Sequence, residues 1–268
     1  MALLRDLAAP VWRLLRRAPP TIPPVAVVYG MGKVGSSAVS AALRQAGLVC
    51  HHIHTLHRPA LIRDARAALE AGELPLRHVS VAMAERAALV RGRGEVRYVT
   101  LVRDPVARTL SAFFENLHRH KGGLAAESDP DRLFAAWLEE TDHRYGLTWF
   151  DREYRDQLGI DVMAHPFDPA RRLAQLPGRG PLVMRIDCPG PQKEAALSAL
   201  YGRPIRIALR NIGADKRYGS AYAAVLARAC IPPELADEVY GSAFVRKFWT
   251  PEEAGAMADR WTGGRRQA

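Results

Sequence analysis

The sequence predicts an α/β protein in which a central parallel sheet lies between two layers of helices, as a three-layer sandwich. Short apolar runs rich in β-branched residues, such as Val25–Tyr29 and Val96–Val102, alternate with longer segments of helical composition. Each of these runs leads into a helix start, through a glycine-rich turn after the first and through Asp104-Pro105 after the second. Because strands that alternate with helices form parallel sheets with right-handed crossovers, we expect helices on both faces.

The chain before Val25 is expected to lie outside this domain, which we place at residues 25–268. Residues 18–24 form a proline-rich linker. Residues 1–17 carry leucines at helical spacing among four arginines, the pattern of a basic amphipathic helix. They are too charged for a signal-peptide core. We expect this segment either to contact an anionic membrane or to dock on the domain.

The remaining elements are predicted from apolar runs and from glycine and proline at their ends. The expected strands are Val25–Tyr29, Leu48–His54, Val96–Val102, Leu182–Ile186 and Ile205–Ala208. The expected helices are Ser36–Ala46, Ala60–Ala71, Val79–Val90, Pro105 to about His118, Tyr218–Ala229, Pro233–Tyr240 and Pro251–Trp261. The segment from Lys121 to Asp156 is polar and rich in helix formers, so we expect a helical insertion there, and the carboxyl-terminal region is expected to be helical.

Composition limits the partners. The 268 residues carry a net charge of +10, which favours an anionic partner. No nucleic-acid motif accompanies this charge, so we expect no nucleic acid. The three cysteines, Cys50, Cys188 and Cys230, are far apart and form no CxxC pair, which argues against a disulfide framework or a zinc–thiolate site. We expect a cytoplasmic protein, with residues 1–17 as the candidate contact with the inner face of the membrane.

The stretch Gly30-Met-Gly-Lys33-Val-Gly35-Ser36-Ser37 is the most informative. It follows an apparent strand and opens a helix, where unpaired backbone N–H groups attract phosphate or sulfate oxygens. The glycines let the backbone approach such a ligand, the lysine adds a cation and the serines add hydroxyl donors. We therefore predict a P-loop-like anion site.

Two familiar loops fit this stretch less well. The spacing Gly30-x-Gly32-x-x-Gly35 matches the dinucleotide fingerprint, but the second predicted strand ends in histidines and lacks the required carboxylate. A nucleoside triphosphate P-loop has lysine where Ser36 stands, and here Lys33 comes three positions earlier. The pattern Lys-x-Gly-Ser-Ser, Lys33 to Ser37, instead fits the loop that binds a phosphosulfate.

A second motif follows about 70 residues later. Arg103 ends the Val96–Val102 strand, and Ser111 lies about two turns into the following helix. Ligands of open α/β sheets bind at the carboxyl ends of the strands. A forked guanidinium and a helix serine at that place can bind one phosphate together.

Together the two motifs resemble those of sulfotransferases that use 3′-phosphoadenosine 5′-phosphosulfate (PAPS). The chain is similar, over about Val25 to Trp261, to bacterial capsular polysaccharide synthesis proteins, a sulfotransferase-like family. Further matching segments are His52–His54, Thr148–Asp151, Gly159–Val162 and Phe244–Trp249.

This resemblance implies a role for each loop residue. Lys33 would contact the bridging and leaving oxygens, and the loop residues Gly32, Val34, Gly35, Ser36 and Ser37 would hold the 5′-phosphosulfate. Arg103 and Ser111 would hold the 3′-phosphate. Lys216 belongs to a basic segment that would close over the nucleotide. No metal is required by such a transfer.

Three residues are candidates for the general base that deprotonates the acceptor. His78 resembles the catalytic histidine in the His-Val-Ser segment of uronyl 2-O-sulfotransferases, His54 ends the second predicted strand, and Glu115 lies one turn past Ser111. The alternation of His52 and His54 also fits a zinc chelate, although no nearby cluster completes such a shell.

We therefore expect an enzyme that moves a sulfuryl group from PAPS to a hydroxyl of a polysaccharide or glycolipid. Two alternatives stay open at this point. One is a nucleotide-dependent phosphotransferase, and the other is a non-catalytic polysaccharide- or membrane-binding protein with the same fold.

Overall fold

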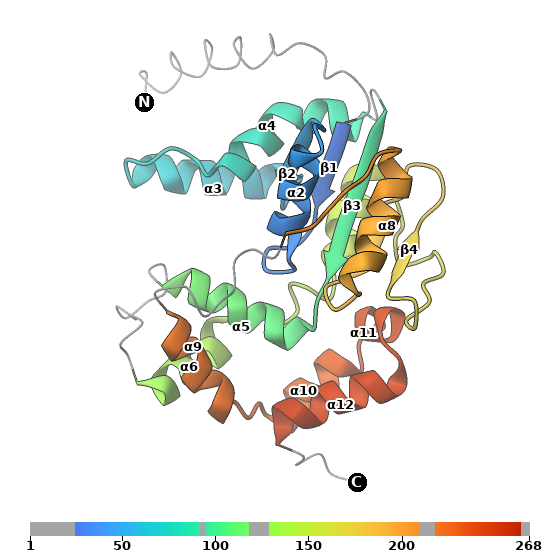
Figure 1. Ribbon diagram of the computed structural model, residues 1–268. Helices are drawn as coiled ribbons and strands as arrows, with labels where there is room; N and C mark the ends of the chain where they lie inside the picture. The colour runs from blue at the N-terminus through green and yellow to red at the C-terminus, as the bar shows by residue number, and fades with distance from the viewer. Residues whose placement is uncertain (1–24, 92–94, 118–128, 209–217, 264–268) are drawn as a thin grey trace.

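The structure is a computed structural model that describes residues 25–91, 95–117, 129–208 and 218–263. Within these residues, strands β1 to β5 form one sheet in the order β2-β1-β3-β5-β4 (Figure 1). The strands are β1 (Val25–Tyr29), β2 (Cys50–Ile53), β3 (Val96–Val102), β4 (Leu173–Gln175) and β5 (Leu182–Arg185). The predicted α/β class is confirmed.

The four strands β2, β1, β3 and β5 are parallel, and only the edge strand β4 is antiparallel to its neighbour. Every residue of β1 is buried, as is every residue of β5, because helices cover both faces of the sheet. Continuous apolar runs are typical of such doubly covered strands, which is why the sequence predicted them well.

Helices surround the sheet on both sides. In Figure 1, α2 (Ser36–Gln45) and α8 (Gly190–Tyr201) lie in front of it, whereas α4 (Arg77–Val90) packs against β2 and the short α7 (Asp156–Leu158). The remaining helices are α3 (Arg58–Glu70), α5 (Pro105–Glu115), α6 (Pro130–Glu140), α9 (Gly219–Arg228), α10 (Pro233–Tyr240), α11 (Ala243–Phe248), α12 (Pro251–Thr262) and a π-helical turn over Asp151–Arg155. The arrangement is consistent with a three-layer sandwich.

One predicted strand is wrong. Residues Ile205–Ala208 form no strand, because side chains of α8 take their backbone N–H groups. The N–H of Ile205 donates to Ser198 Oγ at 2.8 Å, and that of Ile207 donates to Glu194 Oε1 at 2.8 Å. Helices α8 and α11 and strand β4 were not predicted.

Two polar groups, one partly buried and one fully buried, attach the carboxyl-terminal helices to the sheet. Asp104, just after β3, accepts hydrogen bonds from Tyr240 Oη of α10 and Trp261 Nε1 of α12, both at 2.8 Å. Arg185 of β5 donates to Glu253 of α12 at 2.6 and 2.8 Å. Helices α10 to α12 therefore form part of the same packed unit as the strands. No helix of the described chain is both long and apolar enough to cross a membrane.

Candidate functional site

The glycine-rich stretch forms the turn between β1 and α2, at the carboxyl end of the sheet. Gly35 is the N-cap of α2 with a φ of 86°, a left-handed conformation that favours glycine. No side chain caps α2, so the N–H groups of its first turn have no side-chain acceptor there. Val34 is fully buried, whereas Gly35 and Ser37 are exposed. The turn thus presents a helix start to solvent at the place predicted for an anion.

Lys33 adopts an unusual backbone conformation in this turn. Its φ is 71°, one of two positive values among the non-glycine residues that the structure describes. Arg103 stabilises it, because Arg103 Nη1 donates a hydrogen bond to the Lys33 carbonyl oxygen at 2.9 Å. The two predicted motifs therefore meet, although they lie far apart in the sequence.

Helix α5 faces the glycine turn with three residues that are spaced about one helical turn apart, Arg108, Ser111 and Glu115. Glu115 Oε2 pairs with Lys33 Nζ at 2.9 Å and also accepts a hydrogen bond from Tyr218 Oη. Arg108 and Met31 both lie beside Gly146. A Cβ atom added to Gly146 would be 3.4 Å from Arg108 Nε and 3.3 Å from Met31 Sδ. Ser111 lies between Arg108 and Glu115 on the same helix face.

Three histidines line the other side of the turn. His52 Nε2 and Ser36 Oγ are hydrogen bonded at 2.9 Å, and His54 Nδ1 is 2.7 Å from the Gly30 carbonyl oxygen. The His54 ring packs edge-on against His52 at 4.7 Å and against His78 at 4.8 Å between centroids. Two of the three candidate bases are thus neighbours, and the third, Glu115, is the ion-pair partner of Lys33.

Burial disfavours the protonated forms of His52 and His54. It lowers the pKa of His52 to about 3, with smaller contributions from His54, Arg44 and His78. Burial also lowers the pKa of His54, against the opposing effect of its hydrogen bond to Gly30. Neutral imidazoles can accept a proton, as a general base must.

Glu153 fixes the strand ends from which the site residues emerge, and sequence analysis did not single it out. It is 5% exposed and accepts hydrogen bonds from Tyr29 Oη at 2.5 Å, Thr55 Oγ1 at 2.7 Å and the Leu56 N–H at 2.8 Å. Tyr29 ends β1 just before the glycine turn, and Thr55 follows His54. Glu153 therefore fixes the end of β1 and the segment that follows β2. It lies in the π-helical turn, a local geometry that is frequent near functional sites.

Two sequence-based predictions concern residues that the structure does not describe. Lys216 lies outside the described residues, as do residues 1–17. Among the residues that are described, no group of three His, Cys, Asp or Glu side chains is placed to hold a metal ion.

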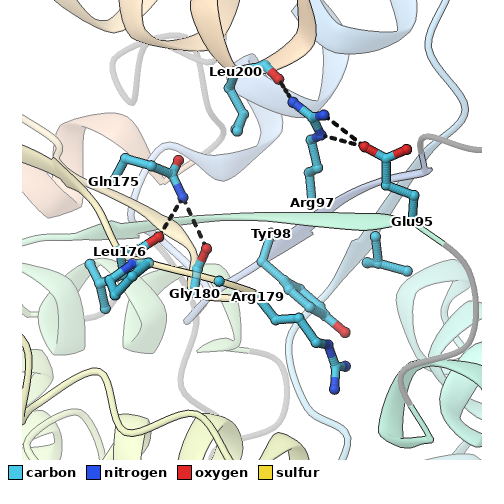
Figure 2. Close-up of a pocket in the computed structure, with 11 residues that line it drawn as sticks. Glu95, Arg97, Tyr98, Gln175, Leu176, Arg179, Gly180 and Leu200 are labelled. Carbon is cyan, nitrogen blue, oxygen red and sulfur yellow. Dashed lines mark hydrogen bonds and ion pairs between the residues drawn. The ribbon is translucent and has the colours of Figure 1, made fainter.

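The pocket drawn in Figure 2 is a separate feature with a volume of about 580 Å³. It lies at the amino end of β3, where Glu95, Arg97 and Tyr98 line it, whereas the glycine turn lies at the carboxyl end of the sheet. Arg97 is already paired with Glu95 at 2.7 Å. Ligands of parallel sheets bind at the opposite edge, so we place the candidate site at the turn.

No protein-family model matches the sequence, and no curated protein or solved structure matches it. The function is therefore inferred from the residues at this edge of the sheet and from their geometry.

Proposed function

We propose that this protein is a PAPS-dependent sulfotransferase that modifies a hydroxyl of a carbohydrate, on a polysaccharide or a glycolipid. The observation that carries the proposal is the hydrogen bond from Arg103 to the Lys33 carbonyl, which brings the two motifs to one edge of the sheet. A lysine, an arginine, two serines and an uncapped helix start there suit a ligand with two separate anionic groups.

The residues of the turn would hold the donor. The first-turn N–H groups of α2 and Ser37 would bind the 5′-phosphosulfate, together with Ser36. Lys33 would exchange Glu115 for the 5′-phosphate and stabilise the charge that develops there. Arg103 and Ser111 would bind the 3′-phosphate, which distinguishes PAPS from ATP.

PAPS supplies an activated sulfuryl group when it is bound. In the transfer, the acceptor oxygen forms a bond to sulfur while the bond from sulfur to the 5′-phosphate oxygen breaks. The electron pair of that bond leaves with the nucleotide product, PAP, and the acceptor proton passes to a base. We assign the base to His54 Nε2, because the Gly30 carbonyl can only accept and so places the proton of neutral His54 on Nδ1.

The test is a thermal-shift comparison of millimolar PAP, ATP with Mg²⁺, NAD and NADP. A ligand at 100 times its Kd adds about 2.7 kcal/mol to the native state, and this raises the Tm of a domain of this size by roughly 5–10 °C. We expect PAP alone to give this shift. Stabilisation by ATP or a dinucleotide with PAP silent would falsify the proposal.

Arg103→Ala should remove most of the PAP-induced shift, because it deletes the predicted ligand of the 3′-phosphate. Arg97→Ala is a matched control, since Arg97 lies on the same strand at its other end. We expect it to keep the full shift. Equal PAP responses in the two variants would remove Arg103 from the nucleotide site.

A further inference from the structure

Arg108 is a buried cation that has no ion-pair or hydrogen-bond partner among the residues that the structure describes. It is 6% exposed. Its Nε is fully buried without an acceptor, and its Cζ lies 5.5 Å from the centroid of the Tyr145 ring. A buried charge without partners costs free energy, so its presence calls for an explanation.

Arg185 shows how this protein compensates a buried arginine that has a structural role. It is 2% exposed and donates to Asp187 at 2.6 and 3.0 Å and to Glu253 at 2.6 and 2.8 Å. Two carboxylates thus satisfy its guanidinium. Among the described residues, no carboxylate forms an ion pair or hydrogen bond with Arg108, although it is almost as deeply buried.

The surroundings of Arg108 are those of the glycine turn. It shares the space beside Gly146 with Met31, the second residue of the turn. Burial lowers the pKa of Arg108 to about 10, Tyr145 and the Asp142 carboxylate oppose this change, and the nearby positive charge of Arg103 adds to it. Arg103 and Arg108 therefore lie close enough to repel one another at the carboxyl end of β3.

We propose that Arg108 binds an oxyanion at this edge of the sheet, together with Arg103. A phosphate, sulfate or carboxylate would offset the positive charge of the two guanidiniums and accept the hydrogen bonds that Arg108 lacks. The anion has two candidate sources: the 3′-phosphate of the donor, an assignment that rests on the proposed function, or an anionic group of the acceptor itself, such as a uronic acid.

The first measurement compares Arg108→Met with Arg185→Met without ligand. Methionine keeps the apolar stem and removes the charge. We expect Arg108→Met to have a Tm equal to or higher than that of the wild type, because an uncompensated charge is removed. Arg185→Met should lower the Tm, because it leaves Asp187 and Glu253 without their partner.

The second measurement titrates the wild type and Arg108→Met with inorganic phosphate. Both are also titrated with inorganic sulfate in the presence of saturating PAP. Arg108→Met should bind phosphate at least tenfold more weakly than the wild type. If the variant also loses its preference for PAP over AMP, the anion is the donor 3′-phosphate. If PAP binding is retained but the response to sulfate is lost, the anion belongs to the acceptor.

An unchanged phosphate affinity in Arg108→Met, with a Tm as low as that of Arg185→Met, would overturn the proposal in favour of a packing role. Should the methionine variant not fold, Arg108→Gln removes the charge but keeps a polar side chain, and normal phosphate binding by it would overturn the proposal as well. The phosphate titration does not depend on the nucleotide. A wild type that ignores PAP but binds phosphate through Arg108 would therefore refute the proposed function alone.

Discussion

A hydrogen bond to the glycine turn orients the ring of His54. The Gly30 carbonyl, 2.7 Å from Nδ1, fixes one neutral tautomer and leaves Nε2 as the basic nitrogen. His78 packs edge-on against that ring, and Glu115 is already paired with Lys33. His54 is hydrogen bonded directly to the backbone of the glycine turn, which is why we favour it over His78.

His54→Gln should lower turnover by roughly 10²–10⁴-fold, the usual contribution of a general base. PAP affinity should change little, because the glutamine amide can still donate to Gly30. Turnover is measured as PAP release from PAPS with a panel of neutral and uronic-acid polysaccharides. His78→Gln is the matched control: a loss confined to that variant would move the base to His78.

The pH profile gives a second check on His54. Its pKa lies below the ordinary value of 6.5, chiefly because of burial. The wild type should therefore stay active at neutral pH and lose activity only as the pH falls through a value below 6.5. A decline that begins above pH 6.5 would contradict a role for neutral His54.

At the scale of elements, α5 connects the candidate site to the rest of the protein. Its N-cap Asp104 accepts the N–H groups of Val106 and Ala107 and the side-chain donors of Tyr240 and Trp261. One carboxylate thus starts the helix that carries Arg108, Ser111 and Glu115, and it also holds α10 and α12 beneath the sheet. The sequence predicted the cap but not the two tertiary hydrogen bonds.

Asp104→Ala should destabilise the protein by about 3 kcal/mol, because it removes a cap and two hydrogen bonds to a charged acceptor. Urea unfolding measures this loss. Asp129→Ala is the control, because Asp129 caps α6 through a single hydrogen bond to the Arg132 N–H. That variant should lose about 1 kcal/mol. Equal losses would mean that the contacts with Tyr240 and Trp261 contribute little.

The elements that sequence analysis identified are those with local signals. Strands β1, β3 and β5 are continuous apolar runs, and α5 begins with an aspartate and a proline. The short apolar run Ile205–Ala208 carries the same local signal, yet Ser198 and Glu194 of α8 bind its N–H groups. Only the folded chain brings these partners together, so the sequence could not reveal them.

The same distinction holds for the candidate site. The glycine turn and Arg103 are recognisable because each motif lies within one strand–turn–helix unit. Glu153 and the uncompensated charge of Arg108 depend on segments that are distant in the sequence. An isolated glutamate or arginine in a helix has many ordinary roles, so only burial and the partners in the structure single these two out.

At the scale of the whole molecule, the buried histidines couple stability to pH. The pKa of His52 is lowered to about 3 by burial and that of His54 is lowered as well, so both stay neutral in the folded state. In the unfolded chain they take up protons below about pH 6.5. The unfolded state then binds more protons than the folded one, and stability falls as the pH falls through this range.

This coupling predicts a measurable loss of stability before the carboxylates begin to titrate. Between pH 6.5 and 5, His52 alone should reduce the free energy of unfolding by about 1.6 kcal/mol, because the slope approaches about 1.4 kcal/mol per pH unit only well below pH 6.5. His52→Gln should flatten the slope of unfolding free energy against pH, whatever its effect at pH 7.5. Asp187 and Glu253, whose pKa values are lowered beside Arg185, lose their contribution only below about pH 4. Urea unfolding at several pH values between 7.5 and 5 therefore measures the contribution of the histidines without that of these two carboxylates. If the unfolding free energy of the wild type and of His52→Gln changed with pH at the same slope, His52 would not be held neutral by its burial against the glycine turn.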